Sequence, residues 1–125
     1  GKGKGRPYGK RIKMSRQPYT DTDNLFYGRG FVQLTWYENY QKAGKKRGID
    51  LHGKPQLALE LKYATQIMFP GMNEGWFTGK KLSDYFQGSK QDWINARRII
   101  NGTDKANLIA GYARNYYSCI GYIAV

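Results

Sequence analysis

Apolar residues recur at helical spacing through the middle of the chain. Leu57, Leu61, Ala64 and Met68 stand at positions i, i+4, i+7 and i+11, which predicts one buried face of a helix. Pro55 precedes them at the place that proline favours in the first turn of a helix. The pattern therefore predicts a helix that begins at Pro55.

Start and stop signals delimit this helix and the one before it. Thr35 predicts the N-cap of a helix that runs through about Lys46, and Gly48 predicts its end. Pro70 predicts an end or a kink in the helix that begins at Pro55, because proline lacks the backbone N–H and its ring clashes with the preceding turn.

The rest of the chain also favours helices. Ser89 and Asp92 have the spacing of a capping box, and Asp104 begins a last helical pattern. Strand signals are weak and no internal repeat occurs, so the predicted fold class is mainly α, with about five helices. The length of 125 residues fits a single domain over residues 1–125.

Residues 1–24 differ from the rest in composition. They are rich in lysine, arginine and glycine, are interrupted by Pro7 and Pro18, and show neither helical nor strand periodicity. They predict an extended basic N-terminal arm or a long loop. A nucleic-acid-binding arm and a loop with solvated charges both fit this composition.

The net charge adds a class of partner. Twenty-one Lys and Arg residues against nine Asp and Glu give +12, a field that attracts nucleic acid, anionic lipid or an anionic cell wall. No run of 18 apolar residues occurs, so the sequence predicts no membrane span. No signal peptide opens the chain either.

Cysteine and histidine each occur once. Cys119 lies among apolar residues and is predicted to be a buried small hydrophobic residue. His52 precedes Gly53 and is predicted to be a surface loop residue. No partners at metal-ligand spacing accompany them, so the sequence predicts no metal and no cofactor.

A polar set follows the Gly-Arg-Gly stretch at residues 28–30. Gln33, Thr35 and Asn39 offer amide and hydroxyl groups that suit sugar hydroxyls and N-acetyl groups, and Trp36 and Tyr40 offer flat faces for pyranose rings. The alternative is that the rings are core and the polar groups are caps. The two glycines predict a close backbone approach or a positive φ rather than a phosphate loop, whose spacing is absent.

Carboxylates are scarce. A glycosidase uses two of them, about 5 Å apart or about 6.5–9.5 Å apart. Glu38 lies on the polar segment but could face solvent, and Glu74 stands close to a turn. Neither forms a pair that the sequence identifies.

The stretch YGRGFVQLTWYENY, residues 27–40, resembles the signature of the family 19 glycoside hydrolases, a chitinase family with endolysin-like members. The family motif Tyr-Gly-Arg-Gly-x-x-Gln-Leu-(Ser/Thr)-x-x-x-Asn-Tyr matches at every fixed position. The resemblance extends through LALELKYATQIMF, GMNEGWFTGKKLSDYF and ARRIINGTDKANLIAGYA, and covers most of residues 1–115. It implies a lysozyme-like, mainly α fold with a sugar-binding cleft.

The resemblance also implies roles for single residues. The position of Thr35 corresponds to a hydroxyl that helps to hold the attacking water. Gln33, Asn39 and Asn101 correspond to amides that contact the substrate. The candidate substrate-binding set is Tyr27, Gln33, Trp36, Asn39 and Asn101.

The chain departs from the family pattern in its carboxylates. The family's general acid lies in a His-Glu-Thr motif, which does not occur here, and its general base is a second glutamate. Both are expected upstream of residue 1, on an N-terminal lobe that would be a partner of this chain. The alternative is a complete protein that has lost catalysis and kept binding.

The expected function is inverting hydrolysis of β-1,4 bonds in a cell-wall glycan, peptidoglycan or chitin. The positive charge favours peptidoglycan and its anionic surroundings, hence a bacteriolytic role at the bacterial cell wall. Two alternatives remain: a non-catalytic carbohydrate-binding module, and a basic nucleic-acid binder.

Overall fold

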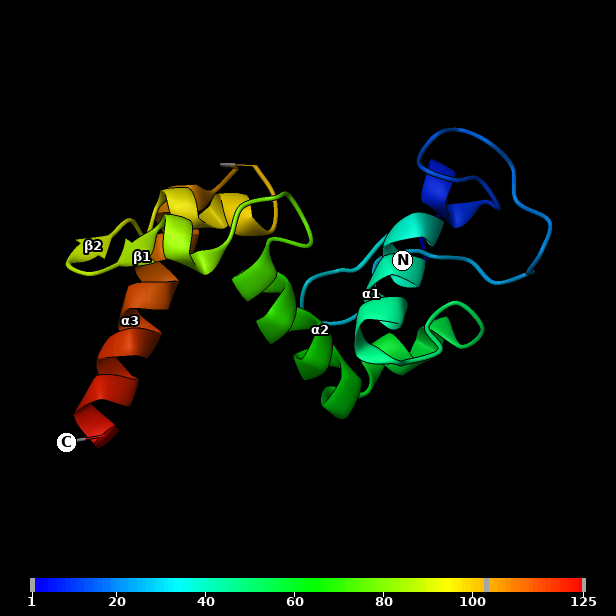
Figure 1. Ribbon diagram of the computed structural model, residues 1–125. Helices are drawn as coiled ribbons and strands as arrows, with labels where there is room; N and C mark the ends of the chain where they lie inside the picture. The colour runs from blue at the N-terminus through cyan, green and yellow to red at the C-terminus, as the bar shows by residue number, and fades with distance from the viewer. Residues whose placement is uncertain (1, 103, 125) are drawn as a thin grey trace. The chain divides into compact units, whose positions relative to one another are not determined.

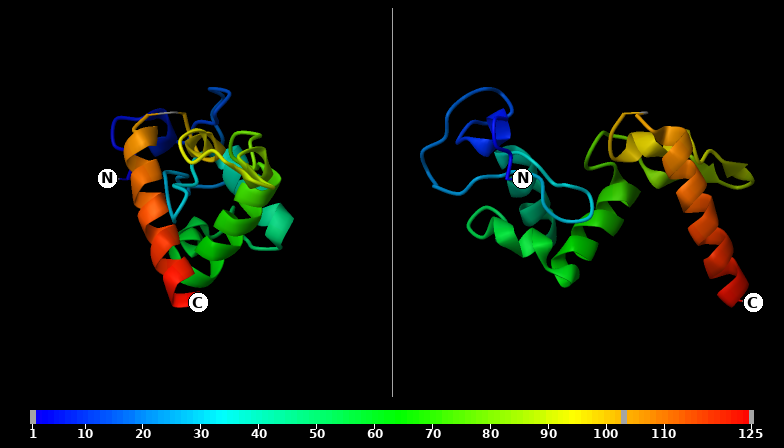
Figure 2. Two further views of the ribbon diagram at one scale, coloured as in Figure 1. Left: turned by 90° about the vertical axis from the view of Figure 1, so that its left-hand side faces the viewer. Right: turned by 180° about the vertical axis from the view of Figure 1, so that it is seen from behind.

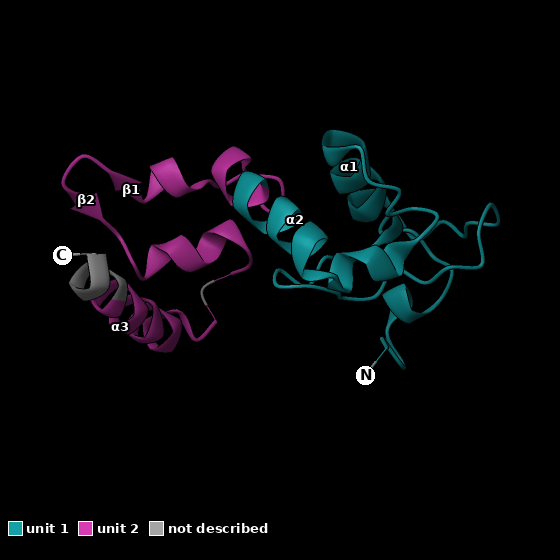
Figure 3. Ribbon diagram, turned by 90° about the horizontal axis from the view of Figure 1, so that it is seen from below, with its two compact units in different colours: residues 1–70 teal, residues 71–125 magenta. Residues whose placement is uncertain are grey.

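The computed structural model describes residues 2–102 and 104–124. Two compact units, Gly1–Pro70 and Gly71–Val125, divide the chain (Figure 3). The helices and strands in chain order (Figure 1) are η1 (Pro7–Gly9), α1 (Tyr37–Arg47), η2 (Pro55–Leu59), α2 (Leu61–Glu74), η3 (Leu82–Asp84), β1 (Phe86–Gln87), β2 (Lys90–Gln91), η4 (Asn95–Ile99) and α3 (Ala106–Ala124). The single domain over residues 1–125 stays a prediction.

The mainly α fold class is confirmed. Within the described residues, three α-helices and four short 3-10 helices (labelled η) stand where the sequence predicted about five helices. Strand is limited to the antiparallel pair β1 and β2. None of the helices in this described part is long and apolar enough to cross a membrane.

Helix α1 ends where the sequence predicted but begins later. Gly48 caps the C-terminus in the left-handed conformation, at φ 66°, as expected. The N-cap is Trp36, and no side chain caps this end, so the prediction that Thr35 caps the helix is wrong. The reason is that the Thr35 hydroxyl instead donates to the carbonyl of Gln33, at 2.7 Å.

The second predicted helix is broken into two elements. Pro55 opens the 3-10 helix η2, and Glu60 is extended (ψ 132°), so the α-helix begins only at Leu61. The break resets the helical phase. Leu61 is consequently 70% exposed, whereas Ala64 is buried as predicted and Ile67 completes the buried face.

Pro70 does not end this helix. The sequence predicted an end or a kink at Pro70, and the end is wrong, because helix α2 continues through Pro70 to Glu74. The kink stays a prediction. The residue after the proline, Gly71, is buried against the ring of Phe77, where a larger side chain would collide. The Phe77 ring therefore packs directly on the backbone at Gly71, next to the proline inside the helix.

The core of the first unit is aromatic. Phe26 stacks on the His52 ring with centroids 5.5 Å apart, and Tyr37 meets both of them edge-on. Tyr19 packs on Phe26 and Tyr37. His52 is therefore a half-buried packing residue, with its Nε2 3.0 Å from Asp21. Asp21 also accepts the Tyr37 hydroxyl, and this hydrogen bond lowers the pKa of Asp21.

The basic N-terminal segment is an ordered loop. It contains η1 and an antiparallel bridge between Ile12 and Pro18, and Figures 1 and 2 show it beside α1. Tyr8 packs edge-on against Trp36, with ring centroids 5.6 Å apart. Of the two predicted alternatives, the structure favours the long loop, anchored by tyrosines.

The second unit differs from the sequence prediction in two details. Ser89 lies in the turn between β1 and β2, and the N-cap of η4 is Ile94, so the predicted capping box is wrong. The Asp92 carboxylate instead accepts the Asn95 N–H at the start of η4. Helix α3 buries the small residues Ala106 and Ala110. Its outer residues are solvated, so Cys119 is exposed and the predicted burial of its side chain is wrong.

Gly30→Ala is predicted to lower the free energy of unfolding more than Gly48→Ala. Both glycines have a positive φ, of 77° and 66°, which costs a side chain about 1–2 kcal/mol. A Cβ at Gly30 would also lie 2.6 Å from the carbonyl oxygen of Ala58, which adds about 1–3 kcal/mol of overpacking. Nothing lies within 4 Å at Gly48.

Urea unfolding of the two variants and the parent chain measures this difference. Equal losses for the two alanine variants would contradict the close approach at Gly30.

Candidate functional site

Three of the predicted site residues, Tyr27, Gln33 and Thr35, lie on or beside a tight bend at the start of the motif. Arg29 and Leu34 form an antiparallel bridge, with N–H to carbonyl distances of 3.2 and 2.9 Å. Gly30 turns the chain with its positive φ, and the bend brings Gln33 and Thr35 back beside Gly28.

Gly28 permits this close approach. A Cβ there would lie 2.8 Å from the Gln33 Oε1 and 3.3 Å from the Thr35 hydroxyl. The two sequence expectations for the glycine pair are therefore both confirmed, one at each glycine. Gly28 supplies the close approach, and Gly30 supplies the positive φ.

Local hydrogen bonds fix the polar side chains of the bend. The Gln33 Nε2 donates to the Gly30 carbonyl at 3.0 Å, and the Asn39 Nδ2 donates to the Thr35 carbonyl at 2.9 Å. The Thr35 hydroxyl donates its only proton to the Gln33 carbonyl. The Thr35 lone pairs can still accept a hydrogen bond, because a hydroxyl has one donor and two acceptor sites.

Backbone strain flanks Thr35 on both sides. Gln33 and Trp36 have φ values of 51° and 80°, in a region that side chains other than glycine rarely adopt. Such conformations cost on the order of 1–3 kcal/mol each and gather at functional sites. The Trp36 N–H donates to the Phe26 carbonyl at 2.7 Å, which holds the strained residue in place.

Arg29 supports the bend from inside. Its side chain is 7% exposed, and its Nη1 donates to the Leu25 carbonyl at 2.9 Å and to the Tyr40 hydroxyl at 3.1 Å. The guanidinium also lies over the Tyr27 ring, 3.8 Å from its centroid. Arg29 therefore positions Tyr27 and is not presented to a ligand.

The bend forms one wall of a pocket of about 360 Å³. The motif contributes Tyr27, Gly28, Gln33 and Thr35, and the N-terminal loop contributes Lys2, Gly3 and Tyr8. The sequence reasoning missed the three loop residues as site residues. The signal for them was the family resemblance of the GKGKGRPYG stretch, since its composition alone indicates only charge.

The remaining predicted residues lie around this pocket or apart from it. Trp36 contacts the pocket residue Tyr8 through its ring, and Asn39 holds the Thr35 carbonyl. Asn101 belongs to the second unit, where its Oδ1 accepts the N–H of Gly102 at 2.9 Å. The substrate-binding roles of all three stay predictions.

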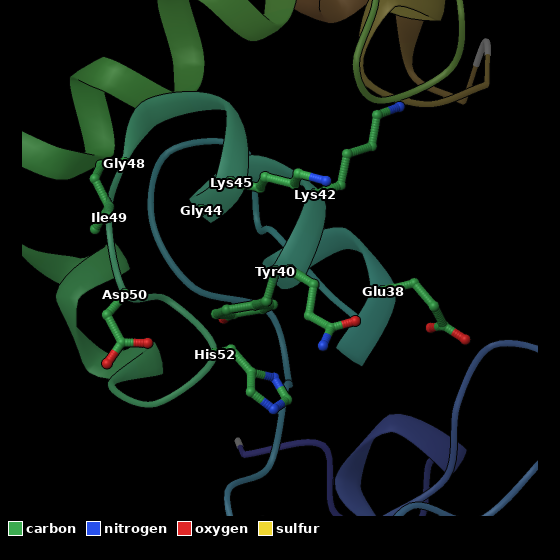
Figure 4. A pocket seen from close by; sticks show the side chains of 10 residues that line it. Glu38, Tyr40, Lys42, Gly44, Lys45, Gly48, Ile49, Asp50 and His52 are labelled. Atoms are coloured by element: carbon green, nitrogen blue, oxygen red, sulfur yellow. The ribbon is translucent and has the colours of Figure 1, made fainter.

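A larger pocket lies elsewhere on the first unit. It has a volume of about 660 Å³, and Figure 4 shows Glu38 and Asp50 on opposite sides of it, with Tyr40 and His52 between them. Each of the two carboxylates accepts a backbone N–H, at 3.2 and 2.9 Å respectively. Their visible role is to fix loops, so the pocket's size alone assigns no chemistry to them.

A metal centre has no basis in the described part of the chain. Within residues 2–102 and 104–124, no three His, Cys, Asp or Glu side chains come close enough to share an ion. The functional groups that the structure does gather are amides, hydroxyls and aromatic rings. They suit a polar, uncharged ligand.

The described residues thus form a mainly α protein with a pocket of polar and aromatic side chains in its first unit. Comparison with known proteins places the chain in a family. Residues 2–81 match the model of glycoside hydrolase family 19, described as chitinase class I. The chain therefore belongs to glycoside hydrolase family 19, as its motif predicted.

Curated relatives agree with the family match. The chain is 32% identical to an endochitinase of Phaseolus vulgaris over 88 residues, which cover 70% of this chain and 25% of the relative. It is 30% identical to acidic endochitinase Q of Nicotiana tabacum over 112 residues, with coverages of 79% and 40%. Chitinase 8 of Oryza sativa subsp. japonica is 53% identical over 36 residues, with coverages of 29% and 14%.

The chain thus spans less than half of the length of these curated relatives. No solved structure matches it.

Tyr40→Phe is predicted to change how stability depends on pH. Burial raises the pKa of Tyr40 to about 12, although the hydrogen bond from Arg29 opposes the rise. The unfolded value is about 10, so the neutral hydroxyl adds stability that is complete below pH 10 and is lost as the pH rises towards 12. This loss is on the order of 2 kcal/mol in the parent chain and is absent from the variant.

Urea unfolding at intervals from pH 9 to pH 12 tests the prediction. The variant should be less stable by about 1–3 kcal/mol at pH 9, because the Tyr27 carbonyl loses its buried donor. The gap should then narrow as the pH rises. Tyr116→Phe, at an exposed position, is the control, and a constant gap for Tyr40→Phe would contradict the buried hydroxyl.

Proposed function

We propose that the pocket beside Gly28 binds an N-acetylhexosamine ring of a β-1,4-linked glycan, within an inverting family 19 hydrolase. One observation carries the proposal. Tyr27, Gln33 and Thr35, three fixed positions of the matched motif, line a single pocket although they lie on a strained bend. Proteins retain such strain mainly where it serves a site.

The arrangement of Thr35 suits the positioning of water. Because its proton is directed to the Gln33 carbonyl, the hydroxyl is left to accept a hydrogen bond from water. Water held by one of its hydrogens keeps a lone pair for attack on the sugar's anomeric carbon. Gln33 still has its Oε1 and one N–H for sugar hydroxyl and acetamido groups.

The acid and the base of the inverting reaction are assigned, through the family resemblance, to a segment upstream of residue 1. None of the described residues that line the pocket is a carboxylate. Inverting hydrolysis needs one carboxylic acid to protonate the leaving oxygen and one carboxylate to activate water. The role proposed for residues 1–125 is therefore binding and water positioning.

A non-catalytic glycan-binding module is the second candidate, and the same lack of carboxylates around the pocket favours it. Both candidates predict that the 125-residue chain alone releases no reducing sugar from peptidoglycan or from chitin. An enzyme that needs no other segment would release it. Hydrolysis by this chain alone would contradict the assignment of the acid and the base to another segment.

The proposed polymer is peptidoglycan, and the site of action is the bacterial cell wall. Neutral chitin offers no partner for a net charge of +12, whereas anionic cell-wall polymers do. Lys2 lines the pocket, so the basic loop lies where a bound glycan would pass. Its neighbours Lys4, Arg6 and Lys10 are exposed.

Gly28→Ala is predicted to weaken glycan binding with little loss of stability. The new Cβ would displace the end of the exposed Gln33 side chain, which loses one hydrogen bond, to the Gly30 carbonyl, at a cost of about 0.5–1.5 kcal/mol. The amide would then leave its place in the pocket. We expect the dissociation constant for an N-acetylglucosamine tetramer to rise at least about tenfold, or about 1.4 kcal/mol.

Calorimetric titration with the tetramer, paired with urea unfolding, measures both quantities. Gly111→Ala is the control, because Gly111, like Gly28, has no positive φ, and nothing lies within 4 Å of its Cβ position. Unchanged tetramer binding in Gly28→Ala would place the glycan away from this bend.

Binding to purified peptidoglycan is predicted to depend on salt. Pelleting with the cell wall should fall between low salt and about 1 M salt, where the screening length drops to about 3 Å. Replacing Lys4, Arg6 and Lys10 by alanine should remove most of this salt dependence and leave tetramer binding unchanged. Salt-independent pelleting of the parent chain would contradict the electrostatic contribution.

A further inference from the structure

The second unit has a pocket of its own, which the proposed function does not use. It has a volume of about 420 Å³ and lies between the β1–β2 hairpin and helix α3. Three aromatic residues and three polar residues surround it, and Gly88 turns the hairpin at φ 60°. All of these residues belong to the unit Gly71–Val125.

The aromatic residues form a continuous row of rings. Trp93 lies between the other two, with its ring centroid 5.0 Å from that of Phe86 and 5.3 Å from that of Tyr117. The rings come from β1, from the segment after β2 and from α3. Trp93 is half-buried and Tyr117 is 59% exposed, so the row offers apolar ring surface to solvent.

Amide groups edge these rings. Gln87 and Gln91 are exposed on the two strands of the hairpin and line the pocket. The Trp93 Nε1 donates to the Gln91 Oε1 at 3.3 Å, which orients the indole and leaves the Gln91 amide N–H groups as donors. Flat apolar faces beside amide donors match a pyranose ring, which has an apolar C–H face and a rim of hydroxyls.

The described lining of the pocket holds no cluster of positive charge of the kind that an anionic polymer requires. Lys90 is its one charged residue among those described, and its Nζ already donates to the Asp84 carbonyl at 2.6 Å. A nucleic-acid site that stacks bases would also require a groove of positive charge along the phosphates. The pocket has no carboxylate in its described lining either, so it offers groups for binding and none for hydrolysis.

We infer that the pocket formed by Phe86, Gln87, Gln91, Trp93 and Tyr117 is a second, non-catalytic site for the uncharged N-acetylhexosamine units of a glycan. One ring of the glycan stacks on Trp93, and the Gln91 amide donates to its oxygen atoms. The inference rests on the proposed function for the kind of sugar, because both sites would hold the same polymer. The site itself depends on residues that the first pocket does not share.

Titration of the isotope-labelled 125-residue chain with the N-acetylglucosamine tetramer, followed by NMR, tests this inference. The indole N–H of Trp93 and the side-chain amide of Gln91 report on the second pocket. The backbone amides of Gly28 and Thr35 report on the first. Saturable shifts at Trp93 and Gln91 are the expected result.

The four outcomes separate the two proposals. Shifts at both pockets support both proposals, and shifts confined to Gly28 and Thr35 overturn this inference alone. Shifts confined to Trp93 and Gln91 support the inference and contradict the proposed function, and no shift at either pocket overturns both. Shifts at Trp93 with a thymidine oligonucleotide but not with the tetramer would overturn the sugar assignment in favour of base stacking.

Two neighbouring tyrosines on α3 give a matched pair of variants. Tyr117 contacts Trp93 in the pocket, whereas Tyr116 is 73% exposed and lies outside it. Tyr117→Ala should weaken the binding measured at Trp93 by about tenfold, and Tyr116→Ala should leave it unchanged. Because both positions are exposed, folding is retained in both variants, and equal effects would overturn the inference.

Discussion

The buried guanidinium of Arg29 is the interaction on which the binding surface of the first unit depends. A charge that is 7% exposed is costly unless fixed dipoles replace its water. Here the Leu25 carbonyl, the Tyr40 hydroxyl and the face of the Tyr27 ring surround it. Residues 25–29 must therefore fold around the guanidinium and meet Tyr40 of α1, and that contact fixes the bend at the glycines. Removing one partner would leave the charge uncompensated, so the requirement extends to each of them.

The two glycines follow from the same constraint, since a chain that wraps around a buried arginine has little room on either side. Gly30 turns the backbone against the Ala58 carbonyl, and Gly28 lets side chains return to within contact distance. The bend then brings Thr35 back with its hydroxyl proton already committed to the backbone. The result is an acceptor held in place before any ligand arrives, which reduces the ordering that binding requires. The strained φ of Trp36 is a consequence of the same geometry.

The sequence predicted those features that depend on the backbone preferences of a few neighbouring residues. The mainly α class, the end of α1 at Gly48 and the two roles of the glycine pair all follow from backbone preferences. The start of α1 did not follow, because the Thr35 hydroxyl had a competing acceptor on the preceding bend. The buried face of α2 was misjudged at Leu61 because the break at Glu60 shifts the helical phase, which no periodicity count detects. The part played by Tyr8 in the pocket depends on its contact with Trp36, far away in the sequence, and could be foreseen only through the family resemblance.

The two pockets differ in what their groups can contribute to binding. In the pocket beside Gly28, a hydrogen bond to a ligand replaces one to water, so each adds little net affinity. A ligand that leaves one of these polar groups unpaired is nevertheless penalised. Apolar ring surface at the second adds affinity by burial and discriminates less. A glycan polymer suits both, because it repeats the same ring along its length and can occupy more than one site of the same class. If one glycan chain reaches both proposed sites, two weak sites hold it more firmly than either alone. A single short ligand would gain nothing from the second pocket, so a pair of such sites favours a polymeric substrate.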